Sequence, residues 1–290
     1  MAKSDFGAHG IWSAQFATGS PAEVSRHVAE LDAQGWGAIW FPGMGGGDDV
    51  YGIAERLLQA GNQAKVAVGV AGIWELDPAA TARTHRRLQD AYGDRLVSGF
   101  GVSGPDRARA AGKEFGSPLA AMRKFLDDLD AADPPLPRDE RVIGTLGRRI
   151  TMLAGERAAG VHPFLVTPVA VARDRALIGP DALIAPYLPV VLETDPVRAR
   201  AIARHGIGMF LGIPSYQGNL LRLGFGEEDF APGGSDRLID SLVAWGDLAK
   251  ITTRIREFQD AGADHLALHA LTGSDAFPVA EWKELSGLLS

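Results

Sequence analysis

The stretch RVIGTLGRRITMLAGERAAGVHPFLVT, residues 141–167, decides the expected fold because it contains one complete structural repeat. Short apolar segments at Arg141–Leu146 and Val161–Thr167 predict two strands, and a helix beginning at Arg148 fits the residues between them. A strand, a helix and a second strand form the unit from which parallel sheets covered by helices are built. The stretch therefore indicates an α/β protein.

The start of the helix in this stretch has the composition of an anion site. Gly147 lets the backbone approach a ligand closely, and the N–H groups of a first helical turn have no partner within the helix. Arg148 and Arg149 add two guanidinium groups, which bind phosphate through paired hydrogen bonds. These three residues predict a phosphate site. The alternative is that Gly147 only makes a tight turn and that the arginines are solvated.

The same alternation of strand and helix runs through the rest of the chain. Continuous apolar segments are typical of strands that are buried on both faces. These segments are Gly7–Ser13, Gly37–Pro42, Lys65–Gly72, Arg95–Val102, Ala182–Leu192 and His265–Leu271. With the two strands of the opening stretch they make eight, which predicts a (β/α)8 TIM barrel formed by residues 1–290 as a single domain. The alternative, an open doubly wound sheet, lacks the GxGxxG motif expected after its first strand.

One segment, at about residues 210–247, is longer than an ordinary barrel loop and follows the seventh predicted strand. Loops at the carboxyl ends of barrel strands line active sites, so we expect this insertion to form part of a substrate pocket or a lid. Its residues Phe210, Tyr216, Leu220 and Phe225 would suit an apolar or aromatic compound. Alternatively, they form the core of the insertion itself.

Composition excludes several classes of function. The net charge of −7 and the absence of a lysine-rich run argue against a nucleic-acid partner. The absence of cysteine excludes disulfides, thiolate metal sites and a cysteine nucleophile. No apolar run is long enough to span a membrane, and the first residues, MAKSDFGAHGIW, lack the apolar region of a signal peptide. We therefore expect no membrane partner and a cytoplasmic location.

Histidines are the strongest candidates for acid, base or metal-binding groups. His265 begins a strand and His269 lies nearer its carboxyl end, so the two are separated by about 13 Å, too far to share a metal. We expect no metal site. His9 and His162 are either core residues or neighbours of a cofactor. No Ser/His/Asp order and no P-loop is found, so the sequence identifies no catalytic residue.

Five segments carry a resemblance to a known family. They are LDAQGWGAIWFP, KVAVGVAGIWELDPAATA, DRLVSGFGVSG, LGRRITMLAGERAAGVHPFLVTP and FQDAGADHLALHAL. In this order and spacing, over nearly the whole chain, they resemble the bacterial luciferase-like superfamily of flavin or deazaflavin oxidoreductases. Within it, ERAAGVHPFLVTP and GSDRLIDSLVAWGD resemble proteins assigned to coenzyme F420, a deazaflavin.

The resemblance implies hydride transfer between coenzyme F420 and a small organic substrate, with an FMN-dependent monooxygenase as the alternative. The cofactor ring would lie against a bulge of the third strand, often with a non-proline cis peptide, which falls here around Ala71 and Gly72. The fourth strand end would line the ring or its polyol chain, and the phosphate would lie at the helix start described above. The residues implied to bind the cofactor are Ala71, Gly72, Gly101, Val102, Ser103, Gly147, Arg148, Arg149 and Thr167. A homodimer is implied because dimers are common in the family.

The sequence departs from the family after the second strand. Several deazaflavin members carry an acidic residue, or a histidine with a tryptophan, where this chain has GMGGG at residues 43–47. The proton-transfer group is therefore not identified. A cofactor-free barrel without catalysis is the third interpretation.

Overall fold

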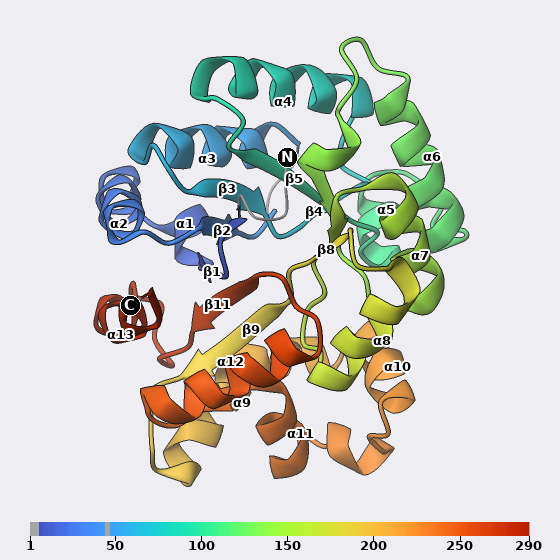
Figure 1. The fold of residues 1–290 in the computed structure, drawn as a ribbon. Helices are drawn as coiled ribbons and strands as arrows, with labels where there is room; N and C mark the ends of the chain where they lie inside the picture. Colours follow the sequence, from blue (N-terminus) through green and yellow to red (C-terminus); the bar gives the residue numbers. More distant parts are fainter. Residues whose placement is uncertain (1–5, 44–46, 290) are drawn as a thin grey trace.

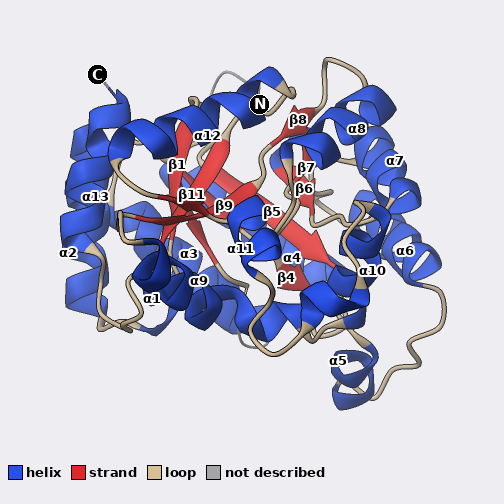
Figure 2. Cartoon of the chain, turned by 90° about the horizontal axis from the view of Figure 1, so that it is seen from below, coloured by secondary structure: helices blue, strands red, loops and turns tan. Residues whose placement is uncertain are grey.

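The chain forms a parallel sheet surrounded by helices, as described by a computed structural model for residues 6–43 and 47–289. Figure 2 shows the strands in the centre and the helices around them. The strands are β1 (His9–Trp12), β2 (Ala38–Phe41), β3 (Lys65–Val68), β4 (Ala71–Gly72), β5 (Leu96–Gly101), β6 (Arg141–Ile143), β7 (Gly160–Val161), β8 (Leu183–Ile184), β9 (Tyr187–Val191), β10 (Ala244–Trp245) and β11 (Leu266–Ala270).

The sheet has the strand order β10-β9-β11-β1-β2-β3-β5-β6-β7-β8, with β4 paired to β5, and every pair is parallel. Its two ends meet through one segment of chain, because β8 pairs with β7 and β9, which follows immediately, pairs with β11. A further bridge joins Phe164 to Tyr187 across this seam. The predicted α/β barrel fold is confirmed.

Two predicted strands are each divided in the structure. Ala182–Leu192 becomes β8 and β9, separated by Ala185 and Pro186, because the pairing partner changes from β7 to β11 at this point. Lys65–Gly72 becomes β3 and β4, which flank a cis peptide bond between Gly69 and Val70. The bulge therefore occurs in the predicted strand, and Val70, the second residue of the cis bond, immediately precedes Ala71.

Helices cover the outside of the sheet, as Figure 1 shows for α2, α3 and α4 beside the early strands. They are α1 (Gln15–Thr18), α2 (Pro21–Gln34), α3 (Gly47–Ala60), α4 (Pro78–Tyr92), α5 (Pro105–Ala110), α6 (Pro118–Asp130), α7 (Arg148–Arg157), α8 (Pro168–Ile178), α9 (Pro196–Leu211), α10 (Pro214–Arg222), α11 (Asp236–Leu242), α12 (Leu248–Asp260) and α13 (Val279–Leu285).

Helix starts follow a repeated local rule. A side-chain oxygen accepts a hydrogen bond from the first turn, and proline occupies the first helical position, where its missing N–H costs nothing. The capping residues before these prolines are Ser20, Asp77, Ser117, Thr167 and Asp195. Gly35 ends α2 with φ of 92°, a conformation that favours glycine.

Alternate strand residues face two different cores. In β2, Ile39 and Phe41 pack with the covering helices, whereas Ala38 and Trp40 belong to the cluster that fills the barrel interior. This alternation is the geometry of a strand with both faces buried.

The segment at about residues 210–247 folds into α10, a 3-10 helix (Glu227–Phe230), α11 and β10. The two-residue strand β10 was not predicted, and it extends the sheet by pairing with β9. Leu220 and Phe225 are buried and pack in the same cluster as the barrel interior, which favours the core alternative for these two residues. The role of the segment as a lid or pocket wall stays a prediction.

Candidate active site

The amino end of α7 is open to a ligand in the structure. Gly147 is its N-cap residue, with extended backbone and no side-chain cap on the first turn. A Cβ placed on Gly147 would have one heavy atom within 4 Å, a terminal nitrogen of Arg222 at 3.8 Å. Arg148 and Arg149 are both exposed, and within the described part of the chain neither side chain has an ion-pair partner. The predicted residues are therefore available to an anion.

A third guanidinium, which the sequence did not single out, reaches the same place. Arg222 is the last residue of α10, and its Nη2 donates a hydrogen bond of 2.9 Å to the carbonyl of Leu146. Its position depends on how the 210–247 segment folds back on the barrel. The contact between Arg222 and Leu146 therefore could not be predicted from the spacing of residues in the sequence. Three arginines are thus located at or beside one helix N-terminus, an arrangement that attracts anions strongly.

The bulge of the third strand is organised around Val70. Its methyl groups occupy space that three glycines of the neighbouring strands leave free. An added Cβ would lie 3.0 Å from Val70 on Gly99, 2.8 Å on Gly101 and 3.0 Å on Gly144. Val70 itself stays half-buried. Gly101 has a packing role, because its missing side chain makes room for Val70.

The predicted residues of the third and fourth strand ends are adjacent. Ala71 pairs with Phe100 and Gly72 with Gly101. A Cβ on Gly72 would lie 2.9 Å from the hydroxyl oxygen of Ser103, which is exposed and has φ of 59°. Ala71, Gly72, Gly101 and Ser103 thus come together at one edge.

Two other predicted residues have structural contacts of their own. Val102 is half-buried and packs against the cluster that faces the helices. The Thr167 hydroxyl accepts a hydrogen bond of 3.4 Å from the Ala170 N–H and so caps α8. Its proximity to the phosphate stays a prediction.

One tryptophan and two histidines, Trp40, His162 and His265, pack together inside the barrel. Trp40 Nε1 donates to His265 Nε2 at 2.9 Å, so His265 Nδ1 carries the proton that it donates to the Gly7 carbonyl at 2.9 Å. The His162 ring stacks on Trp40 with centroids 4.2 Å apart. Burial lowers the pKa of His162 to about 3 and that of His265 to about 4, which keeps both rings neutral. Both histidines are core residues.

His162 keeps one unsatisfied atom. Its Nδ1 donates to the Ala185 carbonyl at 2.6 Å, and its buried Nε2 has no hydrogen-bond partner among the residues that the structure describes. A Cβ on Gly69 would lie 2.6 Å from that nitrogen, so the bulge backbone covers it. His9 is half-buried near Gln259, and burial lowers its pKa.

Four rings pack together, and we call them the mouth cluster: Trp12 and His269, near the carboxyl ends of β1 and β11, Phe164, which follows β7, and Tyr187, the first residue of β9. The Phe164 and Tyr187 rings are stacked with centroids 4.1 Å apart, and Trp12 lies edge-on to both at 5.6 Å and 5.2 Å. The Trp12 and His269 centroids are 4.6 Å apart. Tyr187 and His269 share a hydrogen bond of 2.7 Å. Sequence reasoning had placed His269 near a strand end without finding this partner.

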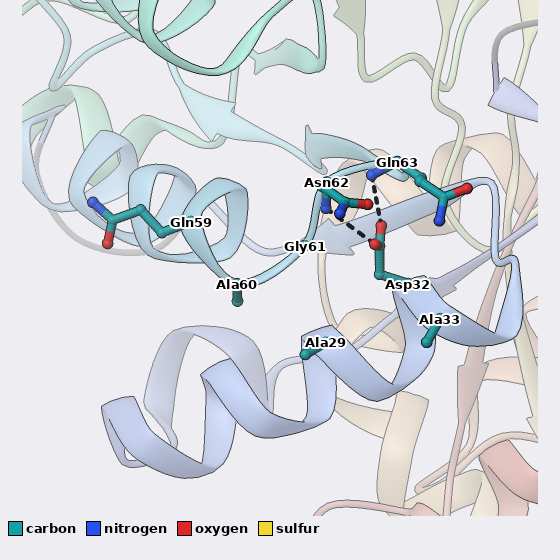
Figure 3. Close-up of a pocket in the computed structure, with 8 residues that line it drawn as sticks. All are labelled: Ala29, Asp32, Ala33, Gln59, Ala60, Gly61, Asn62 and Gln63. Carbon is teal, nitrogen blue, oxygen red and sulfur yellow. Dashed lines mark hydrogen bonds between the residues drawn. The ribbon is translucent and has the colours of Figure 1, made fainter.

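A separate hollow of about 320 Å³ lies between α2 and α3 (Figure 3). Its central carboxylate, on Asp32, accepts three backbone N–H groups, from Asn62, Gln63 and Ala64. Burial acts to raise the pKa of Asp32, but these hydrogen bonds hold it below its usual value. The hollow lies just before β3, at the amino end of the strand, so we assign it a structural role.

Within residues 6–43 and 47–289 no cluster of three histidine or acidic side chains could hold a metal.

No family model matches the chain, and no curated protein matches its sequence. Solved structures do match. An F420-dependent secondary alcohol dehydrogenase in complex with an F420-acetone adduct agrees with a TM-score of 0.71 at 14% identity, over 96% of both chains. The chain has the fold of this enzyme.

Two other solved structures agree with it. The coenzyme F420-dependent tetrahydromethanopterin reductase from Methanopyrus kandleri gives a TM-score of 0.69 at 16% identity, over 97% of both chains. The oxygenating constituent of 3,6-diketocamphane monooxygenase from Pseudomonas putida, in complex with FMN, gives 0.71 at 12% identity over 96% of both chains. The luciferase-like resemblance is confirmed at the level of the fold, and these neighbours include both F420-dependent and FMN-containing proteins.

Proposed function

We propose that the protein is an oxidoreductase that transfers a hydride between coenzyme F420 and a small organic substrate. The observation that carries this proposal is the amino end of α7, where Arg148, Arg149 and Arg222 surround an uncapped first turn. The fold agrees with that of F420-dependent enzymes, and the cationic groups lie after the fifth barrel strand, at the carboxyl edge where barrels bind ligands.

The residues present fit a phosphate-bearing cofactor. The backbone at Gly147 has open space beside it, and the guanidinium groups of Arg148 and Arg149 have no ion-pair partner within residues 6–43 and 47–289. Between this point and the bulge lies Thr145, which is 3% exposed and whose buried hydroxyl has no hydrogen-bond partner in the described part of the chain. A polar group of a ligand would satisfy that hydroxyl, since a buried polar atom left unpaired is costly.

The bulge fits the flat ring of such a cofactor. Val70 offers a half-buried apolar surface, and Gly72 and Ser103 lie beside it at the same edge. Both deazaflavin and flavin supply hydride chemistry when bound, so the protein has to provide position and a dry surface. In this assignment the arginines hold the phosphate, Val70 supports the ring, and the mouth cluster excludes water from one side.

FMN is the alternative cofactor, because it would use the same phosphate site. A barrel without cofactor is the second alternative, motivated by the GMGGG sequence. Residues 44–46 of that sequence lie outside the described residues, so this interpretation stays open to the binding experiment. The homodimer and the cytoplasmic location also stay predictions.

Calorimetric titration of the purified protein with F420 and, in parallel, with FMN tests the proposal. We expect F420 to bind more tightly, and we expect the Arg148→Ala/Arg149→Ala variant and the Arg222→Ala variant to bind it more weakly. A charged hydrogen bond contributes about 1.5 to 3 kcal/mol, which is roughly tenfold to a hundredfold in affinity for each contact.

Arg86→Ala is the matched control, because Arg86 is an exposed helical arginine of α4 paired with Asp90 at 2.9 Å. It should bind F420 as the unaltered protein does. Tight binding of FMN alone would overturn the choice of cofactor, and binding of neither would favour the cofactor-free barrel.

A further inference from the structure

Tyr187 and His269 lie on neighbouring strands and face the same side. In the β9 and β11 register Tyr187 is opposite Ala267, so His269 is two residues further along, on the same face. The Tyr187 oxygen and His269 Nδ1 are 2.7 Å apart. Tyr187 is 2% exposed, whereas His269, the next-to-last residue of β11, stays half-buried between two buried neighbours.

The direction of the hydrogen bond between Tyr187 and His269 follows from the need of the buried Tyr187 O–H for an acceptor. The Tyr187 O–H has one hydrogen-bond partner among the described residues, which is His269 Nδ1. If Nδ1 carried the proton, the buried tyrosine hydrogen would have no acceptor, and such groups are rarely left unpaired. Tyr187 therefore donates, Nδ1 accepts, and the single proton of a neutral imidazole resides on Nε2.

The surroundings keep both groups in these states. Burial raises the pKa of Tyr187, so its hydroxyl remains protonated, and burial lowers the pKa of His269 to about 3, so its ring remains neutral. The ring contacts of the pair are with Trp12 and Phe164, which carry no charge. Nε2 has no hydrogen-bond partner within residues 6–43 and 47–289. His269 keeps partial exposure near the carboxyl end of β11, so we infer that this N–H is accessible to a bound ligand.

We propose that His269 Nε2–H is a substrate-binding donor for the oxygen of a neutral carbonyl compound or its alcohol, and that Tyr187 is the positioning residue that fixes its tautomer. A neutral donor among apolar rings favours a neutral oxygen over a carboxylate or phosphate, since no cation of the cluster would offset the desolvation of an anion. The three aromatic rings suit a substrate with an apolar or aromatic body. The placement of this substrate in a hydride-transfer reaction rests on the proposed function, whereas the tautomer and the donor do not.

The tautomer can be observed without any cofactor. Nitrogen-15 NMR of protein labelled at histidine distinguishes a protonated from an unprotonated ring nitrogen, and the His269→Gln variant identifies the signals of His269. We expect Nε2 to be protonated in the unaltered protein and the Nδ1–H tautomer to appear in Tyr187→Phe. Tyr51→Phe is the matched control, since Tyr51 is a buried tyrosine whose hydroxyl bonds to Ser98 at 2.9 Å. Protonation at Nδ1 in the unaltered protein would overturn the assignment.

The donor can be tested with an aromatic aldehyde, 4-(dimethylamino)benzaldehyde, whose absorption moves to longer wavelength when its carbonyl accepts a hydrogen bond. We expect this shift on binding to the unaltered protein and to Tyr51→Phe, its loss in His269→Phe, and its partial return in His269→Gln, which restores an N–H donor. An undiminished shift in His269→Phe, or no binding of the aldehyde at millimolar concentration, would overturn the proposal.

Titration of the same variants with F420 separates this inference from the proposed function. Tyr51→Phe, which alters neither proposed site, should bind F420 as the unaltered protein does. If F420 does not bind the unaltered protein but the tautomer and the aldehyde shift are as expected, the proposed cofactor is wrong and the donor site stands. If F420 binds the unaltered protein and the aldehyde shift survives in His269→Phe, the proposed cofactor stands and the donor site is wrong.

Discussion

Val70 lies against the position that a side chain of Gly101 would occupy, with its Cγ2 2.8 Å from where a Cβ would stand. The two residues belong to neighbouring strands and fit together because one of them has no side chain. The shape of the bulge at the proposed ring site is therefore determined as much by the glycines of β5 as by β3 itself.

Gly101→Ala should destabilise the fold, because Val70 or the backbone has to move. Overpacking of this kind costs about 1 to 3 kcal/mol, which urea unfolding followed by circular dichroism would measure. Gly104→Ala is the control, since no atom lies within 4 Å of its added Cβ and its φ is negative. In the double variant Val70→Ala/Gly101→Ala much of the loss should be recovered, and a purely additive loss would contradict the packing relationship.

Gly147→Ala should separate binding from folding. Its φ of −147° suits alanine, and the nearest atom to an added Cβ is 3.8 Å away, so we expect unfolding free energy to change by no more than about 0.5 kcal/mol. Affinity for F420 should fall, because the methyl group keeps the phosphate away from the backbone. Unchanged affinity, measured by the same calorimetric titration, would remove Gly147 from the site.

Asp32→Asn should lower stability near neutral pH, because the amide is a weaker acceptor for the three N–H groups that precede β3. The pKa of Asp32 is lower in the folded protein than in the unfolded chain, so its contribution is present above about pH 4 and is lost as the pH falls through the folded value. Urea unfolding of both proteins from pH 6 downward should show their difference shrinking on the acidic side. A difference that is constant with pH would contradict the role of the ionised carboxylate.

Asp130→Ala should weaken the start of β6. Arg141 is 1% exposed, and its Nη2 donates to the Asp130 carboxylate at 2.7 Å. Asp130 also pairs with Arg157 at 2.6 Å. Loss of the buried charged hydrogen bond to Arg141 should account for most of a cost of about 1.5 to 3 kcal/mol, because two carbonyl acceptors of Arg141 remain. Asp127→Ala removes only the more exposed pairing with Arg157 and should cost less than about 1 kcal/mol. Equal losses in the two variants would argue against a special role for the buried arginine.

Features of the fold that depend on local chemistry could be predicted from the sequence. Ser20 and Asp77, each followed by proline, predicted helix starts that the structure confirms, because a cap involves residues only a few positions apart. Apolar runs predicted the strands for the same reason. The division of Ala182–Leu192 at Pro186 could not be predicted, since it follows from a change of pairing partner from β7 to β11.

The candidate site was predictable only in part. Gly147, Arg148 and Arg149 are consecutive, so a strand and helix pattern was enough to propose them. Arg222 reaches Leu146 across 76 positions, and Tyr187 meets His269 across 82, so both contacts depend on the tertiary fold. Val70 was missed because its role depends on two glycines of β5 and on Gly144, which follows β6.

The segment that closes the barrel also carries Tyr187, one residue after Pro186. Any variant that loosens this closure therefore also releases the hydroxyl that sets the proton position on His269, whereas Tyr187→Phe removes that hydroxyl and leaves the strand pairing in place. Directed evolution for a new substrate would meet different constraints at the two residues. His269 can be exchanged without altering the segment that closes the barrel. A library that varies residues 183–191 changes barrel closure and substrate recognition at once.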